Sequence, residues 1–319
     1  MKNKGTRIGL ILTGIILTII AGVLLALWLR DCDELQLFPT GTISSQTQTA
    51  DEPETIFSET RVTIIDVGQG SAALIESAGE YALIDTGSTE RAQVPIAVLK
   101  RIGAERITLL VNTHWDNDHC GATIGILKNF QVEHFAGAGY ETETRTYQRI
   151  REYLTEEKIE LEIPKPGDTY TVGSCCITII GPVRTDYEGE NNRCISLILS
   201  DGKNRVFFGG DTEAEGEGDL LASGVDLDCD VYICNHHGSA DASSRPFLEA
   251  LSPEYTVISC GRDNEYGHPA KRTLDTIRDC GSLLYRTDLQ SDIVFRMTEK
   301  GLVFEQDPTE DWTPGVYMQ

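Results

Sequence analysis

Hydrophobic residues recur along most of the chain in short runs, and polar segments that contain glycine separate them. Runs of about three to six aliphatic, aromatic or alternating residues predict strands at 61–66, 71–76, 81–85, 107–111, near 132, 175–180, 195–200, 205–208, 231–234, 255–259, 283–285, 293–297 and 302–304. Helical spacing predicts helices over 90–102, just after Gly121, and at 144–154, 213–223, 246–251 and 270–280. Strands and helices alternate in two halves, which predicts an α/β sandwich with two sheets inside.

The first 60 residues follow a different pattern. The apolar run Ile8–Leu29 contains no charged residue, and 22 helical residues span about 33 Å, enough for the hydrocarbon layer of a membrane. Three cations precede it, which places residues 1–7 in the cytoplasm and the rest of the chain outside. A cleaved signal peptide is the alternative, but its apolar region is shorter and a small-residue cleavage motif is missing before Arg30.

We therefore expect a single-pass protein of the cell membrane with its body outside the cytoplasm. Its parts are a cytoplasmic N-terminus (1–7), a transmembrane anchor (8–29), a polar linker (30–60), a folded body (61–306) and a C-terminal tail (307–319).

Composition and charge narrow the function of this body. Of the 319 residues, 40% are hydrophobic and 24% charged, as in a folded protein. The formal net charge is −23, and the first 30 residues hold four cations and no acid, so the remainder carries −27. Such a surface argues against binding nucleic acid through a broad basic face. The nine cysteines leave at least one free thiol, and the sequence assigns no disulfide pairing.

A dense group of metal-competent side chains follows the strand at 107–111. His114, Asp116, Asp118 and His119 lie within six positions of one loop. In an extended loop the first three side chains point to one side, and the fourth turns back beside them. Two imidazoles and two carboxylates can surround one divalent cation or be shared between two, and a cation removes the repulsion between the acids. A solvated acidic loop that happens to contain histidines is the alternative.

Further candidates also stand at strand ends. Asp211 follows the strand at 205–208, the pair His236 and His237 follows the strand at 231–234, and His268 follows the strand at 255–259. Five of the six histidines therefore lie in such loops, where active sites of α/β folds gather. We expect one histidine of the pair to bind metal and the other to contact substrate. A helix-capping role is the alternative for His268 and, taken alone, for Asp211.

These residues, in this order, resemble the metallo-β-lactamase superfamily, and more closely the extracytoplasmic domain of ComEC-type DNA-uptake proteins. Asp116 stands where most of the superfamily has a second histidine, as in that branch. The segments that carry the resemblance, over roughly residues 60–305, are Asp66–Ser71 (DVGQGS), His114–His119, Asn191–Leu197, Gly210–Asp211, His236–Ser239 and Tyr266–Pro269. Ser71 departs from the pattern, which has an acid there.

The resemblance implies an αββα sandwich that holds two divalent metal ions, Zn or Mn. By its ligand pattern, His114 and Asp116 hold one ion, Asp118 and His119 hold the other with His236 (or His237), and Asp211 bridges both. The superfamily's extra histidine for the first ion is missing, and Asn191 or Asn192 stands in its place. We expect His237, Ser239 and Asn192 to contact the substrate.

The resemblance implies a hydrolase that uses a metal-bridged hydroxide, and we expect it to be a phosphodiesterase or nuclease. In this reading Asp118 positions the water and accepts a proton, and His268 serves the leaving group. Five cations near the motif loops could line a local basic groove for DNA: Arg193, Arg205, Arg245, Arg262 and Lys271. Hydrolysis of surface polymers or small phosphoesters, as in phosphorylcholine esterases, and a non-catalytic metal-stapled binding domain are the alternatives. A β-lactamase is disfavoured, and no protein partner is expected.

Overall fold

The computed structural model describes residues 59–316. The predicted N-terminal segment, anchor and nearly all of the predicted linker therefore lie outside the described residues. Within the described range, no helix combines the length and apolar character that crossing a bilayer requires. The eight cysteines of this range are all free thiols.

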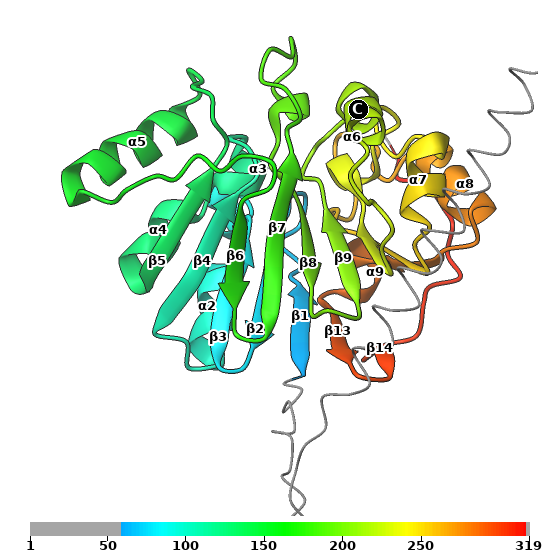
Figure 1. Cartoon of the computed structure of the whole chain (residues 1–319), viewed down its shortest axis with the longest axis horizontal. Coiled ribbons are helices and arrows are strands. Elements are labelled where there is room, and N and C mark those ends of the chain that lie inside the picture. The colour runs from blue at the N-terminus through cyan, green and yellow to red at the C-terminus, as the bar shows by residue number, and fades with distance from the viewer. Residues whose placement is uncertain (1–58, 317–319) are drawn as a thin grey trace, which may run out of the picture. The chain divides into compact units, whose positions relative to one another are not determined.

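Two seven-stranded sheets form the centre of the domain (Figure 1). The first sheet has the spatial order β14 (Gly301–Phe304), β13 (Ile293–Thr298), β1 (Thr60–Ile64), β2 (Ala73–Ser77), β3 (Glu80–Ile84), β4 (Arg106–Asn112) and β5 (Gln131–Gly137). The second has the order β12 (Leu283–Arg286), β11 (Tyr255–Ile258), β10 (Val231–Ile233), β9 (Arg205–Phe208), β8 (Ser196–Ser200), β7 (Cys175–Gly181) and β6 (Thr169–Val172).

Both sheets are mixed. In the first, β13, β1, β2 and β3 pair antiparallel, and β3, β4 and β5 pair parallel. In the second, β6 to β9 pair antiparallel, and β9 to β12 pair parallel. The parallel strands of each sheet thus present their carboxyl ends at one edge, which is where ligand-binding loops of α/β folds lie.

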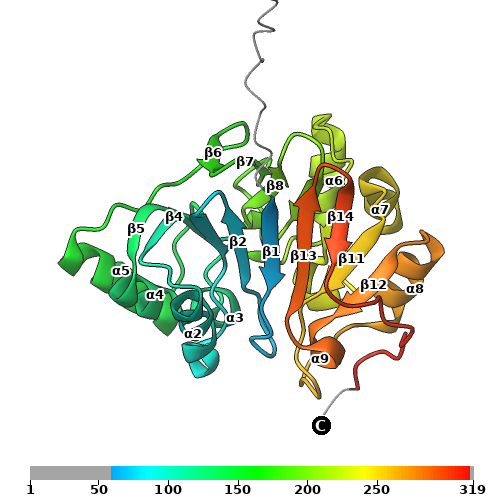
Figure 2. The same cartoon turned by 90° about the horizontal axis from the view of Figure 1, so that it is seen from below.

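Helices cover the outer face of each sheet (Figure 2). On one side lie α2 (Gln93–Arg101), α3 (Asn117–Cys120), α4 (Thr123–Asn129) and α5 (Arg145–Glu157), and on the other α6 (Ala214–Ser223), α7 (Arg245–Leu251) and α8 (Lys271–Asp279). Short helices η1 (Thr89–Arg91), η2 (Asn191–Arg193), η3 (Asn235–Gly238) and α9 (Thr287–Gln290) lie in the loops. The predicted αββα sandwich is confirmed.

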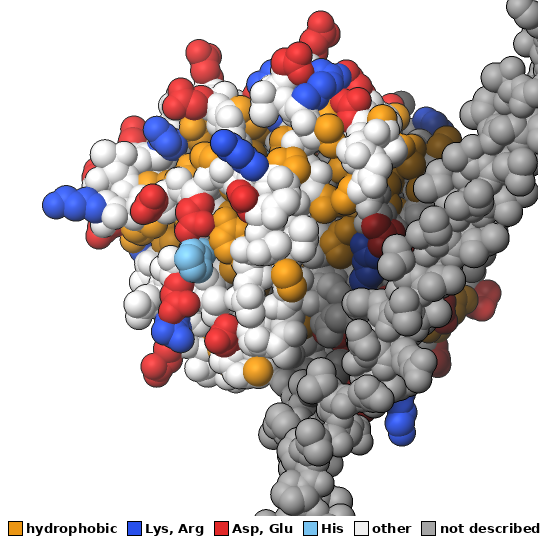
Figure 3. Space-filling model, in the orientation of Figure 1, with side chains coloured by type: hydrophobic (Ala, Val, Ile, Leu, Met, Phe, Trp, Pro, Cys, Tyr) orange, Lys and Arg blue, Asp and Glu red, His pale blue; other side chains and the backbone are white. Residues whose placement is uncertain are grey.

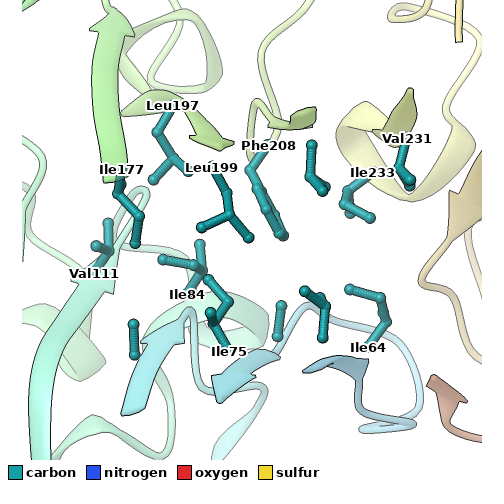
Figure 4. Close-up of a cluster of buried hydrophobic side chains, with 14 of the residues drawn as sticks. Ile64, Ile75, Ile84, Val111, Ile177, Leu197, Leu199, Phe208, Val231 and Ile233 are labelled. Carbon is teal, nitrogen blue, oxygen red and sulfur yellow. The ribbon is translucent and has the colours of Figure 1, made fainter. Parts of the chain in front are cut away.

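The main core fills the space between the sheets (Figure 4). Ile75 and Ile84 from the first sheet face Leu197, Leu199 and Phe208 from the second. Each such side chain contributes about 1.5–3 kcal/mol when it is fully buried. Two further hydrophobic clusters lie beneath the helices, one on each side of the sandwich. This packing fixes the two sheets against each other and so fixes the loops at their shared edge.

Three local features differ from the sequence-based prediction. The strand β6 was not predicted, because its four residues form no hydrophobic run. The predicted helix 90–102 divides into η1 and α2, with Pro95 in the first turn of α2, where its missing N–H has no intrahelical partner to lose. The predicted C-terminal tail is packed: Arg286 donates to the carbonyls of Asp311 and Thr313, and Trp312 joins the core beneath α8.

Candidate metal centre

Loops at the carboxyl ends of β4, β9 and β10 bring the predicted metal ligands together. His114 and His119 follow β4, Asp211 follows β9, and His237 follows β10. All four side chains are buried. Residues more than 120 positions apart in the sequence, His114 and His237, therefore converge because three strands end at the same edge of the sandwich.

The first group of ligands consists of His114, His119 and Asp211, whose ligand atoms all lie within 4.8 Å of one another. Asp211 Oδ2 lies 3.7 Å from His114 Nε2, and Asp211 Oδ1 lies 3.0 Å from His119 Nε2. Asp116 stands at the rim of this group: its side chain is 43% exposed, and Oδ2 lies 3.7 Å from His114 Nε2.

The second group consists of Asp118, His119 and His237, again within 4.8 Å. His237 Nε2 lies 3.2 Å from Asp118 Oδ2 and 3.6 Å from Asp211 Oδ1. His119 belongs to both groups, and its Nε2 lies 3.0 Å from that of His237. Asp118 and Asp211 therefore both approach His237 Nε2, and the two ligand groups are adjacent parts of one cluster.

The residues present fit divalent cations. His114 Nε2 and Asp211 Oδ1 are buried and have no hydrogen-bond partner within the described part of the chain. A buried polar atom without a partner costs about 1–3 kcal/mol, so a folded protein rarely leaves two in one place without a ligand for them. Imidazole nitrogens and carboxylate oxygens that converge in this way suit Zn²⁺ and Mn²⁺.

The cluster also holds its charges in the form that a cation requires. Burial alone would raise the pKa of Asp211, but the imidazoles of His119 and His237 outweigh it and hold the pKa well below its usual range. Burial would likewise raise the pKa of Asp118, but the hydrogen bond to His237 outweighs burial and the pKa is lowered. Conversely, burial would lower the pKa of His119, but Asp211 and Asp85 raise it well above its usual value. Cations must then displace protons from the imidazoles, so metal binding releases protons.

A second set of contacts holds each imidazole with Nε2 toward the cluster. Asp85 Oδ2 lies 2.7 Å from His119 Nδ1, and the carbonyl of Ser259 lies 2.9 Å from His237 Nδ1. Thr113 Oγ1 lies 3.2 Å from His114 Nδ1 and donates to Asp85. Such partners fix the orientation of metal-binding imidazoles. Sequence reasoning missed Asp85, although an acid at the end of a predicted strand was a usable signal.

The structure distinguishes the two neighbouring histidines. His237 lies inside the cluster, whereas His236 is 21% exposed, with Nε2 3.6 Å from Asp211 Oδ2 and Nδ1 3.5 Å from Glu213 Oε1. Both residues have positive φ values, 50° and 53°. This left-handed turn directs the two side chains to different places. Of the two histidines between which the sequence left the choice open, His237 joins the second ligand group with Asp118 and His119, whereas His236 lies beside Asp211 and Glu213.

Two other predicted substrate contacts have roles within the fold. The side-chain oxygen of Asn192 accepts hydrogen bonds from the backbone N–H groups of Glu213 and Gly216 at the start of α6. Ser239 is buried, and its hydroxyl accepts from the backbone N–H of Asp241. Ser239 nevertheless lines a groove beside His236 and His268, whereas the buried carboxamide of Asn192 supports α6. The loop geometry thus accounts for Asn192 without a substrate.

The segment Asp66–Ser71 packs against the loop that carries the metal ligand Asp118. A Cβ atom on Gly70 would lie 2.4 Å from the carbonyl oxygen of Asp118, and the backbone of Gly70 has a φ of +147°. The N–H of Ser71 donates to that same carbonyl at 3.0 Å. Gly70 is therefore required because this loop packs directly on the backbone that carries Asp118.

Gln69 connects this segment to His268. Its Oε1 accepts from the backbone N–H of Gly261 at 3.1 Å, so its amide nitrogen faces His268 Nδ1, at 3.3 Å. Burial, with the charges of His237 and His236, lowers the pKa of His268 to about 4. The neutral ring accepts from Gln69 at Nδ1 and keeps its proton on Nε2. His268 thus presents an N–H donor; its ring centroid lies 5.7 Å from that of His236.

Two grooves open beside the cluster. The larger, of about 850 Å³, is lined by the loops after β1, β3, β4 and β11 and by α9, and it reaches the metal centre at Asp118. The smaller, of about 540 Å³, contains His236, His268 and Ser239, and the C-terminal residues Pro314 and Gly315 form one wall. Tyr266 lines both. A substrate that occupies both grooves would therefore cross the ring of Tyr266, with Asp118 in one groove and His236 in the other.

Comparison with known proteins agrees with this geometry. A family model described as the metallo-beta-lactamase superfamily matches residues 65–262. The chain is 26% identical over 275 residues to ComE operon protein 3 of Bacillus subtilis, which covers 80% of this chain and 35% of the relative. It is 30% identical over 253 residues to competence protein ComA of Neisseria gonorrhoeae, covering 76% and 33%. The matched region thus spans about a third of the length of these curated relatives.

Solved structures share the fold at low sequence identity. The metallo-beta-lactamase fold protein YhfI of Bacillus subtilis superposes with a TM-score of 0.52 at 15% identity, covering 75% of this chain and 99% of that one. CmlA, a diiron beta-hydroxylase of Streptomyces venezuelae, gives 0.51 at 16% identity, covering 74% and 54%. The chain belongs to the metallo-β-lactamase superfamily, and its curated relatives include competence proteins of the ComEC type.

Proposed function

We propose that this member of the metallo-β-lactamase superfamily is a metal-dependent phosphodiesterase that acts on nucleic-acid strands. The observation that carries the proposal is the pair of adjacent ligand groups that share His119, with Asp211 in reach of both. Two neighbouring divalent cations are the usual catalysts of phosphodiester displacement. The groove of about 850 Å³ that meets the centre at Asp118 offers room for an extended substrate.

The residues that would hold the cations follow from the geometry. His114, His119 and Asp211 would hold one, with Asp116 at the rim, and Asp118, His119 or Asp211, and His237 would hold the other. Zn²⁺ and Mn²⁺ both suit these donors. When bound, the cations would polarise a phosphoryl oxygen and lower the pKa of water toward neutrality.

The other groups of the site would act on the substrate and on the attacking water. The carboxylate of Asp118, which stays ionised, would orient the water and accept a hydrogen bond from it. The Nε2–H of His268, fixed by Gln69, would donate to the leaving oxygen or to the negative charge that develops on the phosphoryl group. Together they would supply a hydrogen-bond acceptor for the water and a donor for the phosphoryl group.

The relatives support nucleic acid as the substrate. One of them is named competence protein ComA, another is ComE operon protein 3, and a third, 27% identical over 257 residues, is recombination protein 2 of Haemophilus influenzae. Since the matched region covers only about a third of each, we propose the hydrolytic step alone and not DNA transport. Hydrolysis of surface-polymer or small phosphodiesters is the second candidate, favoured by the formal charge of −27 after the first 30 residues.

The charged side chains are arranged in keeping with a local, rather than a broad, binding surface. On the uncovered left-hand part of the face in Figure 3, Lys and Arg side chains stand singly among Asp and Glu. This part of the face therefore offers no continuous basic surface to a polyanion.

We also propose that residues 8–29 anchor the enzyme in the cell membrane with the domain outside the cytoplasm. The uncharged apolar run and the cations before it support this orientation. Protease treatment of intact cells should remove the domain if it is exposed, whereas a domain protected until the cells are broken would contradict the proposal.

The experiment that tests the proposed activity uses the purified full-length chain with Zn²⁺ or Mn²⁺. We expect cleavage of single-stranded DNA and of bis(p-nitrophenyl) phosphate, and loss of at least 100-fold in kcat in Asp118→Ala with its folding unchanged. Glu156→Ala, an exposed acid on α5, is the matched control. Full activity of Asp118→Ala would reject the mechanism, and cleavage of small diesters without DNA would favour the second candidate.

A further inference from the structure

The larger groove contains two arginines that have no carboxylate partner within residues 59–316. Arg91 enters from η1, and Arg262 enters from the loop after β11. Figure 2 shows the intervening loop after β1 between α3 on one side and α9 on the other. The guanidinium of Arg91 makes no hydrogen bond or ion pair with another described residue, and that of Arg262 donates only to the backbone carbonyl of Asp288. Both side chains are exposed.

Of the other cations expected near the motif loops, three are paired with carboxylates, and Arg193 lies outside this groove. Arg205 pairs with Asp226, Arg245 with Asp279 at 2.6 Å, and Lys271 with Asp275 at 2.5 Å. Arg193 donates to the carbonyl of Tyr187. Of the five cations predicted to line a basic groove, Arg262 is thus the one that lies in this groove without a carboxylate partner. Arg91 also lies in the groove, although no sequence motif includes it.

Five acids line the same groove: Asp118 belongs to the metal centre, Glu265 is exposed, and the other three are engaged. Asp66 accepts from the backbone N–H of Gly68, Glu90 accepts from Asn117, and Asp288 pairs with the buried Arg286. Their negative charges remain, but Arg286 neutralises that of Asp288. The two arginines therefore present the unpaired N–H donors of the groove, and guanidinium groups bind phosphate through several such donors at once.

Tyr266 supplies a flat apolar surface at the junction of the two grooves. Its side chain is 51% exposed, and its ring stacks on His268 with an interplanar angle of 22° and centroids 5.6 Å apart. One face of the Tyr266 ring thus packs on the ring of His268, and the other is available to a planar group. Exposed aromatic rings beside cationic side chains are the usual elements of single-strand nucleic-acid sites.

From these features we infer a nucleotide subsite in the larger groove, next to the metal centre. Arg91 and Arg262 bind the phosphate that neighbours the scissile one, and a base unstacked from its neighbours packs on Tyr266. The substrate class is therefore a single-stranded nucleotide polymer rather than an isolated diester. The choice of substrate rests on the proposed function, but binding at the subsite can be measured without catalysis.

The test is equilibrium binding of fluorescein-labelled (dT)12 to the full-length chain in EDTA, by anisotropy over a range of salt concentrations. We expect the double variant Arg91→Gln/Arg262→Gln to bind at least tenfold more weakly at low salt. Its plot of log affinity against log salt should lose about 0.7 in slope, since the two arginines neutralise one phosphate and each neutralised phosphate on a single strand contributes about 0.7. Tyr266→Leu should weaken binding about 5- to 100-fold, the range for one stacked base, with its slope unchanged.

The control is Arg149→Gln, an exposed arginine on α5, which should bind as the wild type does. Equal affinity and slope in the double variant and the wild type would overturn the inference, as would an equal loss in the control. Activity separates this outcome from failure of the proposed function. If the wild type cleaves no bis(p-nitrophenyl) phosphate, the proposed function fails, while the binding measurement still decides the subsite.

Discussion

Replacing Gln69 by Leu tests how the site controls the proton of His268. The amide nitrogen of Gln69 lies 3.3 Å from His268 Nδ1, and its oxygen is held by the N–H of Gly261 at 3.1 Å. This arrangement stabilises the ring with its proton on Nε2, where the proposed reaction needs a donor. Leucine fills similar space but donates no hydrogen bond.

The expected loss follows from the strength of that bond. A neutral hydrogen bond contributes about 1 kcal/mol, so Gln69→Leu should lower kcat about fivefold with little change in KM. Removing the imidazole in His268→Gln should cost about 10²–10⁴-fold, as for a general acid. At neutral pH, Gln69→Glu should lower kcat further than Gln69→Leu does, because a carboxylate accepts a hydrogen bond from Nδ1–H and so stabilises the tautomer without a proton on Nε2.

Two measurements check this prediction. Steady-state kinetics with bis(p-nitrophenyl) phosphate give kcat and KM, and ¹⁵N NMR of labelled histidine reports which ring nitrogen of His268 carries the proton. Gln148→Leu, an exposed position on α5, is the control. An unchanged kcat in Gln69→Leu, or an Nδ1–H tautomer in the wild type, would refute the reasoning.

Three further predictions concern the surrounding contacts. Because unfolded His268 takes up a proton near pH 6.5 and the folded ring only near 4, lowering the pH through this window should reduce the free energy of unfolding of the wild type by up to about 3 kcal/mol relative to His268→Gln, measured by urea unfolding of the metal-free chains. Asp85→Asn should weaken metal binding about 10- to 100-fold in competition titrations with a chelating dye, since it loosens the ring of His119; unchanged affinity would remove Asp85 from the account. Gly70→Ala should lower the melting temperature and the activity together, because its Cβ atom would meet the carbonyl of Asp118 at 2.4 Å; a fully active, stable variant would contradict that packing.

The sequence predicted the fold and the location of the site because both depend on strand ends. His114, His119 and Asp211 directly follow buried strands, so knowing the strands was enough to bring these residues to one edge. The order of His236 and His237 was beyond such reasoning, since two consecutive left-handed residues redirect their side chains. No local pattern marks such a turn without glycine.

Residues that act through tertiary contacts were also missed. Arg91 lies in a short helix without a motif and reaches the groove only because η1 packs beside the loop after β1. The C-terminal residues were expected to form a tail, but Gly315 donates to the carbonyl of Pro269 and lines the groove at His268. Conversely, Asn192 stands in a motif-like segment and caps α6. In each case the decisive contact joins segments that are distant in sequence.

The central claim is that the cluster around His119 and Asp211 holds two divalent cations. Metal content of the purified full-length chain, measured by inductively coupled plasma mass spectrometry after dialysis against metal-free buffer, tests it most directly. The account predicts close to two Zn²⁺ or Mn²⁺ per chain in the wild type and fewer than one in Asp211→Ala, because Asp211 lies within reach of both ligand groups. A wild type that retains no metal, or an Asp211→Ala variant that retains two ions, would contradict it.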